Sequence, residues 1–308
     1  MADQPTASQV HIDVGLTEVS QRVKNTDLIG EKLFPVISVK KDSDLIWIYG
    51  KEALAPEDDS YIPGDDAAEG GWSVSTSAAY ALLPYRKKAK IVWENRDNAD
   101  EPIKYEQDAV TYEREKMLLS LEKRIAAKVL NASLYGANTD AAAVKWDAVD
   151  SDPLMDVEAA RDAIHKSVLL EANTLVLPRK VYNILRVHPK LIEMYKYVVG
   201  GKLSIEQLKE LFEVENILVG KAGELVTPEV GDPVMTPVWT PSKVMLAFVA
   251  PAPGLQQVSF GYVYRKSAYP YVEKYTDVPK HTDNVYLNDK YDIKIQAQDA
   301  GFLLTNVI

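Results

Sequence analysis

Residues 103–131 read IKYEQDAVTYEREKMLLSLEKRIAAKVLN and contain neither glycine nor proline. Charged side chains fill most positions between the apolar ones, which is the pattern of a helix with one apolar face. The apolar residues recur at spacings of seven and four, namely Ile103, Val110, Met117, Leu121, Ile125 and Val129. Because each helical residue adds about 1.5 Å, the stretch predicts a single helix of about 40 Å. Pro102 before it and Gly136 after it agree with the residues that begin and stop helices.

The hundred residues before this helix are different in character. Residues 45–49 and 85–93 have the β-branched and aromatic content of strands. The long stretch between them carries prolines and glycines and no helical period, and a loop of that length argues against a closed monomer. We therefore expect the apolar side chains of the first hundred residues to be buried only against sister copies. Those near the N-terminus are Val10, Ile12, Val14, Leu28, Ile29, Leu33, Phe34 and Val36.

Residues 151–262 alternate helical and strand patterns and predict a compact α/β unit. Asp152 followed by Pro153 is typical of a helix start, and Ser204 with Gln207 fits a capping box. Short apolar runs predict buried strands at 174–177, 217–219 and 244–249. A further strand alternates at 293–297, and we expect it to pack against the helix of residues 103–131. The α/β unit would then be inserted within a second, elongated domain.

Composition excludes several classes of chemistry. The 308 residues include no cysteine and only four histidines, which rules out disulfides and thiolate ligands. The net charge of −10 argues against tight general binding of nucleic acid. There is no apolar run long enough to span a membrane, and no metalloprotease, serine-elbow or dinucleotide motif occurs. We expect a protein that is not an enzyme, has no cofactor or metal, and does not enter a membrane.

Charge is unevenly distributed in the first hundred residues. Residues 52–69 contain seven acidic residues and no basic one, whereas residues 86–90 contain four basic residues and no acidic one. Two interpretations stay open: two solvated loop surfaces, or complementary contact between copies of the chain. The second interpretation makes the following residues candidate inter-subunit contacts: Glu57, Asp58, Asp59, Asp65, Asp66, Arg86, Lys87, Lys88 and Lys90.

Over roughly residues 30–265 the sequence resembles the major capsid (coat) proteins of tailed double-stranded DNA bacteriophages. The resemblance rests on the order and spacing of short segments rather than on one motif. These segments are Leu33-Phe-Pro-Val36, Ser151-Asp-Pro153, Asp156-Val-Glu-Ala-Ala-Arg161, Asn173-Thr-Leu-Val-Leu177, His188-Pro-Lys190, Leu208–Phe212, Ile217-Leu-Val-Gly220, Ala250-Pro-Ala-Pro-Gly-Leu255 and Ser259-Phe-Gly-Tyr262. Residues 286–308 match by strand pattern alone.

The resemblance implies the α+β fold of tailed-phage major capsid proteins. In that family residues 1–40 would be an N-terminal arm and residues 41–100 an extended β-hairpin loop laid over a neighbouring subunit. Residues 101–150 would belong to the peripheral domain with its long spine helix. Residues 151–262 would form the axial α/β domain, and residues 263–308 would return to the peripheral domain.

The resemblance also implies a function. The chain would assemble with itself as hexamers and pentamers into an icosahedral shell that encloses double-stranded DNA without sequence-specific binding. Its partners would be a scaffolding protein and a portal, with a decoration protein as a further partner, and its location the virion capsid after assembly in the host cytoplasm. Three alternatives stay open: an encapsulin-type nanocompartment shell, another phage structural protein such as a tail protein, and a hydrolase or lyase using paired carboxylates.

Overall fold

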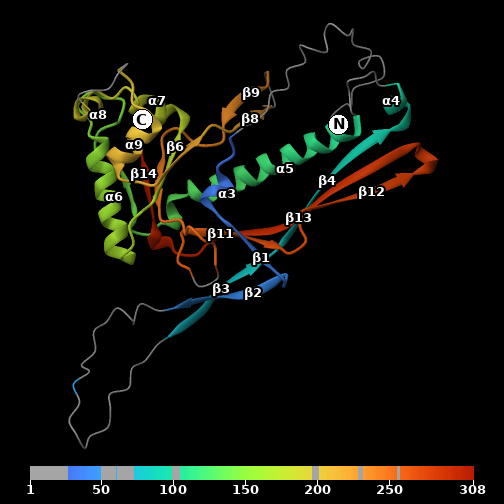
Figure 1. Ribbon diagram of the computed structural model, residues 1–308, viewed down its shortest axis with the longest axis horizontal. Coiled ribbons are helices and arrows are strands. Elements are labelled where there is room, and N and C mark those ends of the chain that lie inside the picture. The colour runs from blue at the N-terminus through green and yellow to red at the C-terminus, as the bar shows by residue number, and fades with distance from the viewer. Residues whose placement is uncertain are drawn as a thin grey trace, which may run out of the picture.

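The structure of the protein is a computed structural model that describes residues 27–49, 60, 73–98, 105–195, 201–227, 232–254 and 257–308. The molecule is elongated (Figure 1). A unit of helices and strands lies at one end, a long helix and a second sheet extend from it, and a narrow hairpin projects away from that helix.

The long helix is α5, Tyr105–Val129, with 25 residues. It confirms the helix predicted over 103–131, of which the first two residues lie outside the described part of the chain. A short helix, α4 (Trp93–Asp97), precedes it, and a 3₁₀ turn, η2 (Ala132–Leu134), follows it.

The second sheet is built around one long strand, β13 (Thr282–Ile295). Its other strands are β1 (Val36–Val39), β11 (Gly261–Lys266), β12 (Tyr271–Asp277) and β4 (Leu83–Val92). Strand β4 pairs along one edge of β13, while β12 and β11 pair along the other. Tyr291 and Ile293 of β13 share a buried cluster with Leu121 and Ile125 of α5. This confirms that the C-terminal strand packs against the long helix.

The segment just before β1 corrects one expectation. Helix α3 (Gly30–Leu33) lies in the chain's own core, where Leu33 and Phe34 are fully buried and Ile29 nearly so. The expectation that this part of the N-terminal segment waits for a sister copy is therefore wrong. Val10, Ile12 and Val14 lie outside the described residues.

A buried carboxyl group explains why this segment folds inward. The Glu122 side chain of α5 is only 2% exposed and accepts hydrogen bonds from the backbone N–H groups of Ile29 (3.1 Å) and Gly30 (2.6 Å). It also accepts one from the Trp239 indole N–H at 2.8 Å. A Cβ at residue 30 would lie 2.6 Å from the carboxyl oxygen, so this close approach requires glycine.

The α/β unit has a five-stranded sheet covered by helices. The strand order is β5-β14-β10-β6-β7. The strands are β5 (Thr139–Ala141), β6 (Thr174–Pro178), β7 (Asn216–Gly220), β10 (Val244–Ala247) and β14 (Gly301–Thr305). The helices are α6 (Pro153–Val168), α7 (Arg179–Leu185), α8 (Pro189–Met194) and α9 (Ile205–Phe212).

Local predictions for this unit are confirmed. Asp152 caps α6 by accepting from the Met155 backbone N–H, and Ser204 and Gln207 form the capping box of α9. The three buried strands predicted at 174–177, 217–219 and 244–249 correspond to β6, β7 and β10.

The last strand corrects the expected path of the C-terminus. Residues 263–308 were expected to return to the peripheral domain, but β14 pairs with β10 and with β5 in the sheet of the α/β unit. The 3₁₀ turn η4 (Gln298–Ala300) separates β13 from β14, so the chain passes from one sheet to the other there. The other domain boundaries remain a prediction.

Two narrow hairpins complete the described elements. Strands β2 (Ser43–Tyr49) and β3 (Val74–Ala81) pair antiparallel, and β8 (Gly223–Val226) pairs with β9 (Val234–Pro237). The turn η3 (Val278–Lys280) joins β12 to β13. Within the described ranges, no helix combines the length and apolarity needed to cross a bilayer.

We expect Glu122→Ala to lower the free energy of unfolding by about 3 kcal/mol or more, because three buried N–H donors lose their acceptor. Glu122→Gln keeps one acceptor oxygen and should fall between wild type and the alanine variant. Urea unfolding followed by circular dichroism measures both. Glu193→Ala, at an exposed position of α8, is the matched control. Equal stability of the Glu122→Ala and Glu193→Ala variants would show that the buried carboxyl is not structurally important.

Candidate inter-subunit surface

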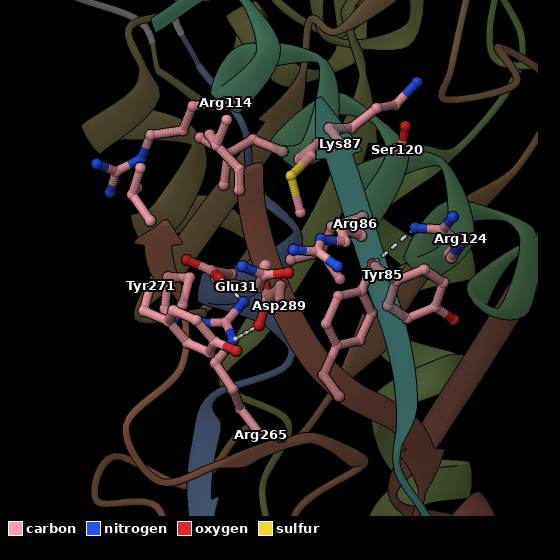
Figure 2. Close-up of a pocket in the computed structure, with 18 residues that line it drawn as sticks. Glu31, Tyr85, Arg86, Lys87, Arg114, Ser120, Arg124, Arg265, Tyr271 and Asp289 are labelled. Carbon is pink, nitrogen blue, oxygen red and sulfur yellow. Dashed lines mark hydrogen bonds and ion pairs between the residues drawn. The ribbon is translucent and has the colours of Figure 1, made fainter. Parts of the chain in front are cut away.

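Helix α5 contacts the second sheet at two separate places. Near its start, Ala109 and Val110 pack on Ala89, Ile91 and Val285. Toward its end, the cluster that contains Leu121 and Ile125 closes on β13. Between these two contacts lies a cavity of about 340 Å³, lined by α5, β4, β12 and β13 (Figure 2).

The wall of this cavity carries more basic than acidic side chains. Two acidic residues line it, Glu31 and Asp289. Five basic residues line it, namely Arg86, Lys87, Arg114, Arg124 and Arg265. Apolar side chains such as Met117, Leu118, Val272 and Leu287 complete the lining. The cavity is therefore a partly apolar space with an excess of positive charge.

Arg124 is held in place on one side of the cavity. The rings of Tyr85 and Tyr291 stack with centroids 4.4 Å apart, and the Arg124 guanidinium lies 4.1 Å above the Tyr85 ring. An Nη1–H of Arg124 also donates to the Tyr291 hydroxyl oxygen at 2.7 Å. Burial raises the pKa of Tyr291 to about 12, so this hydroxyl is neutral at physiological pH. Arg124 is thus fixed by the stack (Figure 2).

Arg265 is held by the two acidic residues. Its Nη2–H donates to Glu31 at 2.9 Å, and its Nε lies 3.2 Å from a carboxyl oxygen of Asp289. Burial raises the pKa of Asp289, and the neighbouring guanidinium opposes that rise. This cluster connects α3, β11 and β13. It compensates the charge of Arg265 within the chain.

The basic residues predicted from sequence are divided between the two faces of β4. Arg86 pairs with Glu273 at 2.8 Å and lies 4.1 Å from the centre of the Tyr286 ring. Lys88 lies 5.8 Å from the same ring. Lys87 follows Arg86 on the alternate face of the strand, and both residues line the cavity beneath α5. Lys90 is exposed, and by the same alternation it belongs with Arg86 and Lys88.

Sequence reasoning missed the other basic residues of the cavity. Arg114 and Arg124 come from α5 and Arg265 from β11, far from the basic stretch in the chain. The helical period of residues 103–131 indicates weakly that Arg114 and Arg124 lie on one long helix. No pattern in the sequence links Arg265 to that helix. Among the described residues, Lys87 and Arg114 make no ion pair. The acidic candidates Glu57, Asp58, Asp59, Asp65 and Asp66 lie outside the described part of the chain.

The β8–β9 hairpin exposes apolar side chains on both of its faces. Leu225 and Met235 face each other across the strands and are 61% and 60% exposed. Val226 and Val234 form the next cross-strand pair and are also exposed. Strand β12 likewise exposes Val272 and Tyr275. A two-stranded ribbon cannot bury its own faces, so both elements present surface suited to contact with another chain.

No group of His, Cys, Asp or Glu side chains within the described ranges is arranged to hold a metal ion. The described site therefore consists of a basic cavity and exposed apolar strands, a combination suited to binding protein segments.

Comparison with known proteins identifies relatives over nearly the whole chain, although no family model matches it. The curated major capsid protein of Burkholderia phage BcepMu is 29% identical over 313 residues, covering 96% of this chain and 96% of that protein. The crystal structure of a phage-related protein from Bordetella bronchiseptica RB50 is 30% identical, has a TM-score of 0.73, and is matched over 96% of this chain and 97% of that one.

More distant structures share the fold. The capsid of cyanophage P-SCSP1u has a TM-score of 0.59 at 10% identity, covering 99% of both chains. The encapsulin of Synechococcus elongatus PCC 7942 has a TM-score of 0.55 at 11% identity, covering 96% of this chain and 95% of that one. These confirm the expected α+β capsid fold. Because the sequence relatives at 29–30% identity extend over almost the full length, this chain belongs to the family of major capsid proteins of tailed bacteriophages.

Proposed function

We propose that the chain assembles as hexamers and pentamers into a closed icosahedral shell that encloses double-stranded DNA. Membership of the capsid family makes it a structural protein of the virion shell. The observation that carries the finer proposal is the relationship to a phage major capsid protein over 96% of the chain. The exposed apolar strands β8, β9 and β12 support it, because they leave surface that neighbouring subunits would cover. The proposed role is structural and involves no catalysis.

The proposed partners follow from the same role. A scaffolding protein would guide assembly in the host cytoplasm, a portal would occupy one vertex, and a decoration protein would bind the outer surface. The net charge of −10 favours a shell that encloses DNA without binding its phosphates tightly.

The proposed domains follow the family pattern. Residues 1–40 act as an arm, residues 41–100 as the extended loop, and residues 101–150 with most of 263–308 as the peripheral domain. Residues 151–262 act as the axial domain. The paired strands β2 and β3 support the extended-loop proposal, because they form a hairpin that leaves the body of the molecule (Figure 1). In this scheme the acidic residues of the loop contact the basic residues around β4 of a neighbouring subunit.

Purified protein, expressed with and without its genomic neighbours, should form closed shells visible by negative-stain electron microscopy. Open tubes or rings would favour the tail-protein alternative. Shells of uniform size that retain a co-expressed enzyme would favour the nanocompartment alternative, since the encapsulin fold is shared. A purified subunit that stays monomeric under every assembly condition would contradict the proposal.

Deletion of residues 1–25 should leave a folded subunit that forms few or defective shells. The described chain begins at Asp27, and the deletion keeps the hydrogen bond of the Ile29 N–H to Glu122 and the ion pair of Asp27 with Lys221 at 2.6 Å. Circular dichroism measures folding, and sedimentation velocity measures assembly. If the truncated subunit unfolds, the deleted residues belong to the core of the subunit itself. Normal shells would show that assembly does not need the arm.

A further inference from the structure

We propose that His188 is a pH-sensitive contact that holds helix α8 against residues 148–152 while its ring is neutral and releases the helix when the ring is protonated. His188 is the residue directly before α8, which lies at the outer edge of the α/β unit (Figure 1). Such a contact belongs to the folded subunit and does not depend on the proposed shell function.

The hydrogen bonds of the His188 ring fix which nitrogen carries the proton. The residue is 3% exposed, and Ser151 beside it is fully buried. The Ser151 hydroxyl oxygen lies 2.7 Å from the backbone carbonyl oxygen of Ala148 and 2.9 Å from Nε2 of His188. The carbonyl can only accept, so the single hydroxyl hydrogen goes to it, and the hydroxyl oxygen accepts from the Nε2–H of the ring. The neutral ring therefore carries its proton on Nε2 and a lone pair on Nδ1.

The other ring nitrogen, Nδ1, is buried and has no hydrogen-bond partner among the described residues. Protonation would place an N–H and a positive charge at this atom with no acceptor for the new hydrogen, and such a group is costly in a buried position. Burial accordingly lowers the pKa of His188 below the ordinary value of 6.5. The Ala148 carbonyl opposes this shift of the pKa, Lys190 adds to it, and Asp152 opposes it. The surroundings of the ring therefore favour the neutral form.

Helix α8 meets the rest of the α/β unit close to this ring. It has only six residues, too few to be stable alone, and the His188 side chain makes no cap hydrogen bond with it. Leu191 is fully buried, while Lys190 donates to the Asp150 backbone carbonyl at 2.8 Å and lies 3.4 Å from an Asp152 carboxyl oxygen. The contacts of His188 and Lys190 therefore both end on residues 148–152, and loss of the first loosens α8 where it meets this loop.

The charged side chains on the neighbouring helices already have partners. Arg186, the residue after α7, donates from Nε to the Leu203 carbonyl oxygen at 3.0 Å. Asp152 caps α6 and pairs with Lys190. A protonated ring would thus meet the positive charge of Lys190, and the Asp152 carboxylate would be shared between two cations.

The direction of the pH effect follows from the difference between the two states. In the released state the ring is in water and has its ordinary pKa of about 6.5, whereas in the closed state its pKa is lower. The closed state binds the proton less readily, so its stability is complete well above pH 6.5 and falls as the pH drops through 6.5. At pH 5.5 about ten of eleven released rings are protonated, so the ratio of released to closed α8 rises by up to about tenfold.

Hydrogen exchange of the α8 amides, followed by mass spectrometry, tests this prediction in the full-length subunit. The Ile192 N–H donates to the His188 carbonyl. After correction for the intrinsic pH dependence of amide exchange, its protection should fall several-fold, and at most about tenfold, between pH 7.5 and pH 5.5. Protection of β10, at the centre of the same sheet, should not change. An equal loss in β10 would show that acid weakens the whole unit, and the release of α8 would be overturned.

His188→Gln is the informative variant, because the glutamine amide can still donate to Ser151 but cannot gain a proton. Its α8 protection should be the same at the two pH values. His165→Gln is the matched control, since His165 is exposed on α6 with Nδ1 3.2 Å from a Glu171 carboxyl oxygen, and this variant should keep the wild-type pH dependence. Wild-type pH dependence in His188→Gln, or its loss in His165→Gln, would overturn the proposal.

A second measurement needs no substitution and decides the question if His188→Gln does not fold. The imidazole Cε1 hydrogen exchanges slowly with deuterium at a rate that depends on protonation of the ring, so mass spectrometry of the wild type gives a titration midpoint for each histidine. The midpoint for His188 should lie below 6.5. A midpoint at 6.5 or above would show that Asp152 stabilises the protonated ring and would contradict the proposal. Neither measurement requires assembled shells, so failure here is distinct from failure of the proposed function.

Discussion

The carboxyl group of Glu122 is the interaction on which the rest of the structure depends. It lies inside the molecule on α5 and accepts three N–H donors from two distant parts of the chain. Two of these donors are the N–H groups of Ile29 and Gly30 at the start of helix α3, where backbone N–H groups have no partner within the helix. The third is the indole of Trp239, which follows β9. One side chain therefore fixes the N-terminal segment and the loop before β10 against the long helix.

The hydrogen bonds of Glu122 also determine how the two sheets meet. Once α3 is held, Phe34 lies over Gly261 of β11, where no side chain larger than hydrogen would fit. Phe34 also meets the ring of Phe260 edge-on, with centroids 5.7 Å apart, and Phe260 stacks on Tyr135. These rings fill the junction between the sheet around β13 and the sheet of the α/β unit. The described core of the subunit is thus closed around these rings, while exposed apolar side chains remain on elements such as β8, β9 and β12.

Local sequence signals predicted the elements well and their long-range partners poorly. The helix of α5, the cap at Asp152 and the capping box at Ser204 depend on residues within a few positions of each other, so they were readable from sequence. The burial of Leu33 and Phe34 was not, because Glu122 lies about ninety positions from the amides it binds. The place of β14 was missed for the same reason, since its partner β10 is far away in the chain.

The residues of the candidate site could be predicted from the sequence only in part. The basic stretch 86–90 was identified from composition, but of its four basic residues only Arg86 and Lys87 line the cavity. Arg114 and Arg265 could not have been assigned to the same space, because their proximity depends on how α5 crosses β11 and β13.

The cavity itself follows from the geometry of a long helix on a twisted sheet. A straight helix of 25 residues can follow such a sheet over only part of its length, and α5 contacts it at two places with a gap between them. Larger apolar residues in that gap would fill it and make the isolated subunit more stable. The gap is lined instead by five basic side chains, of which Lys87 and Arg114 make no ion pair among the described residues. The second sheet and α5 are therefore held together at the two ends of the cavity and not along its whole length.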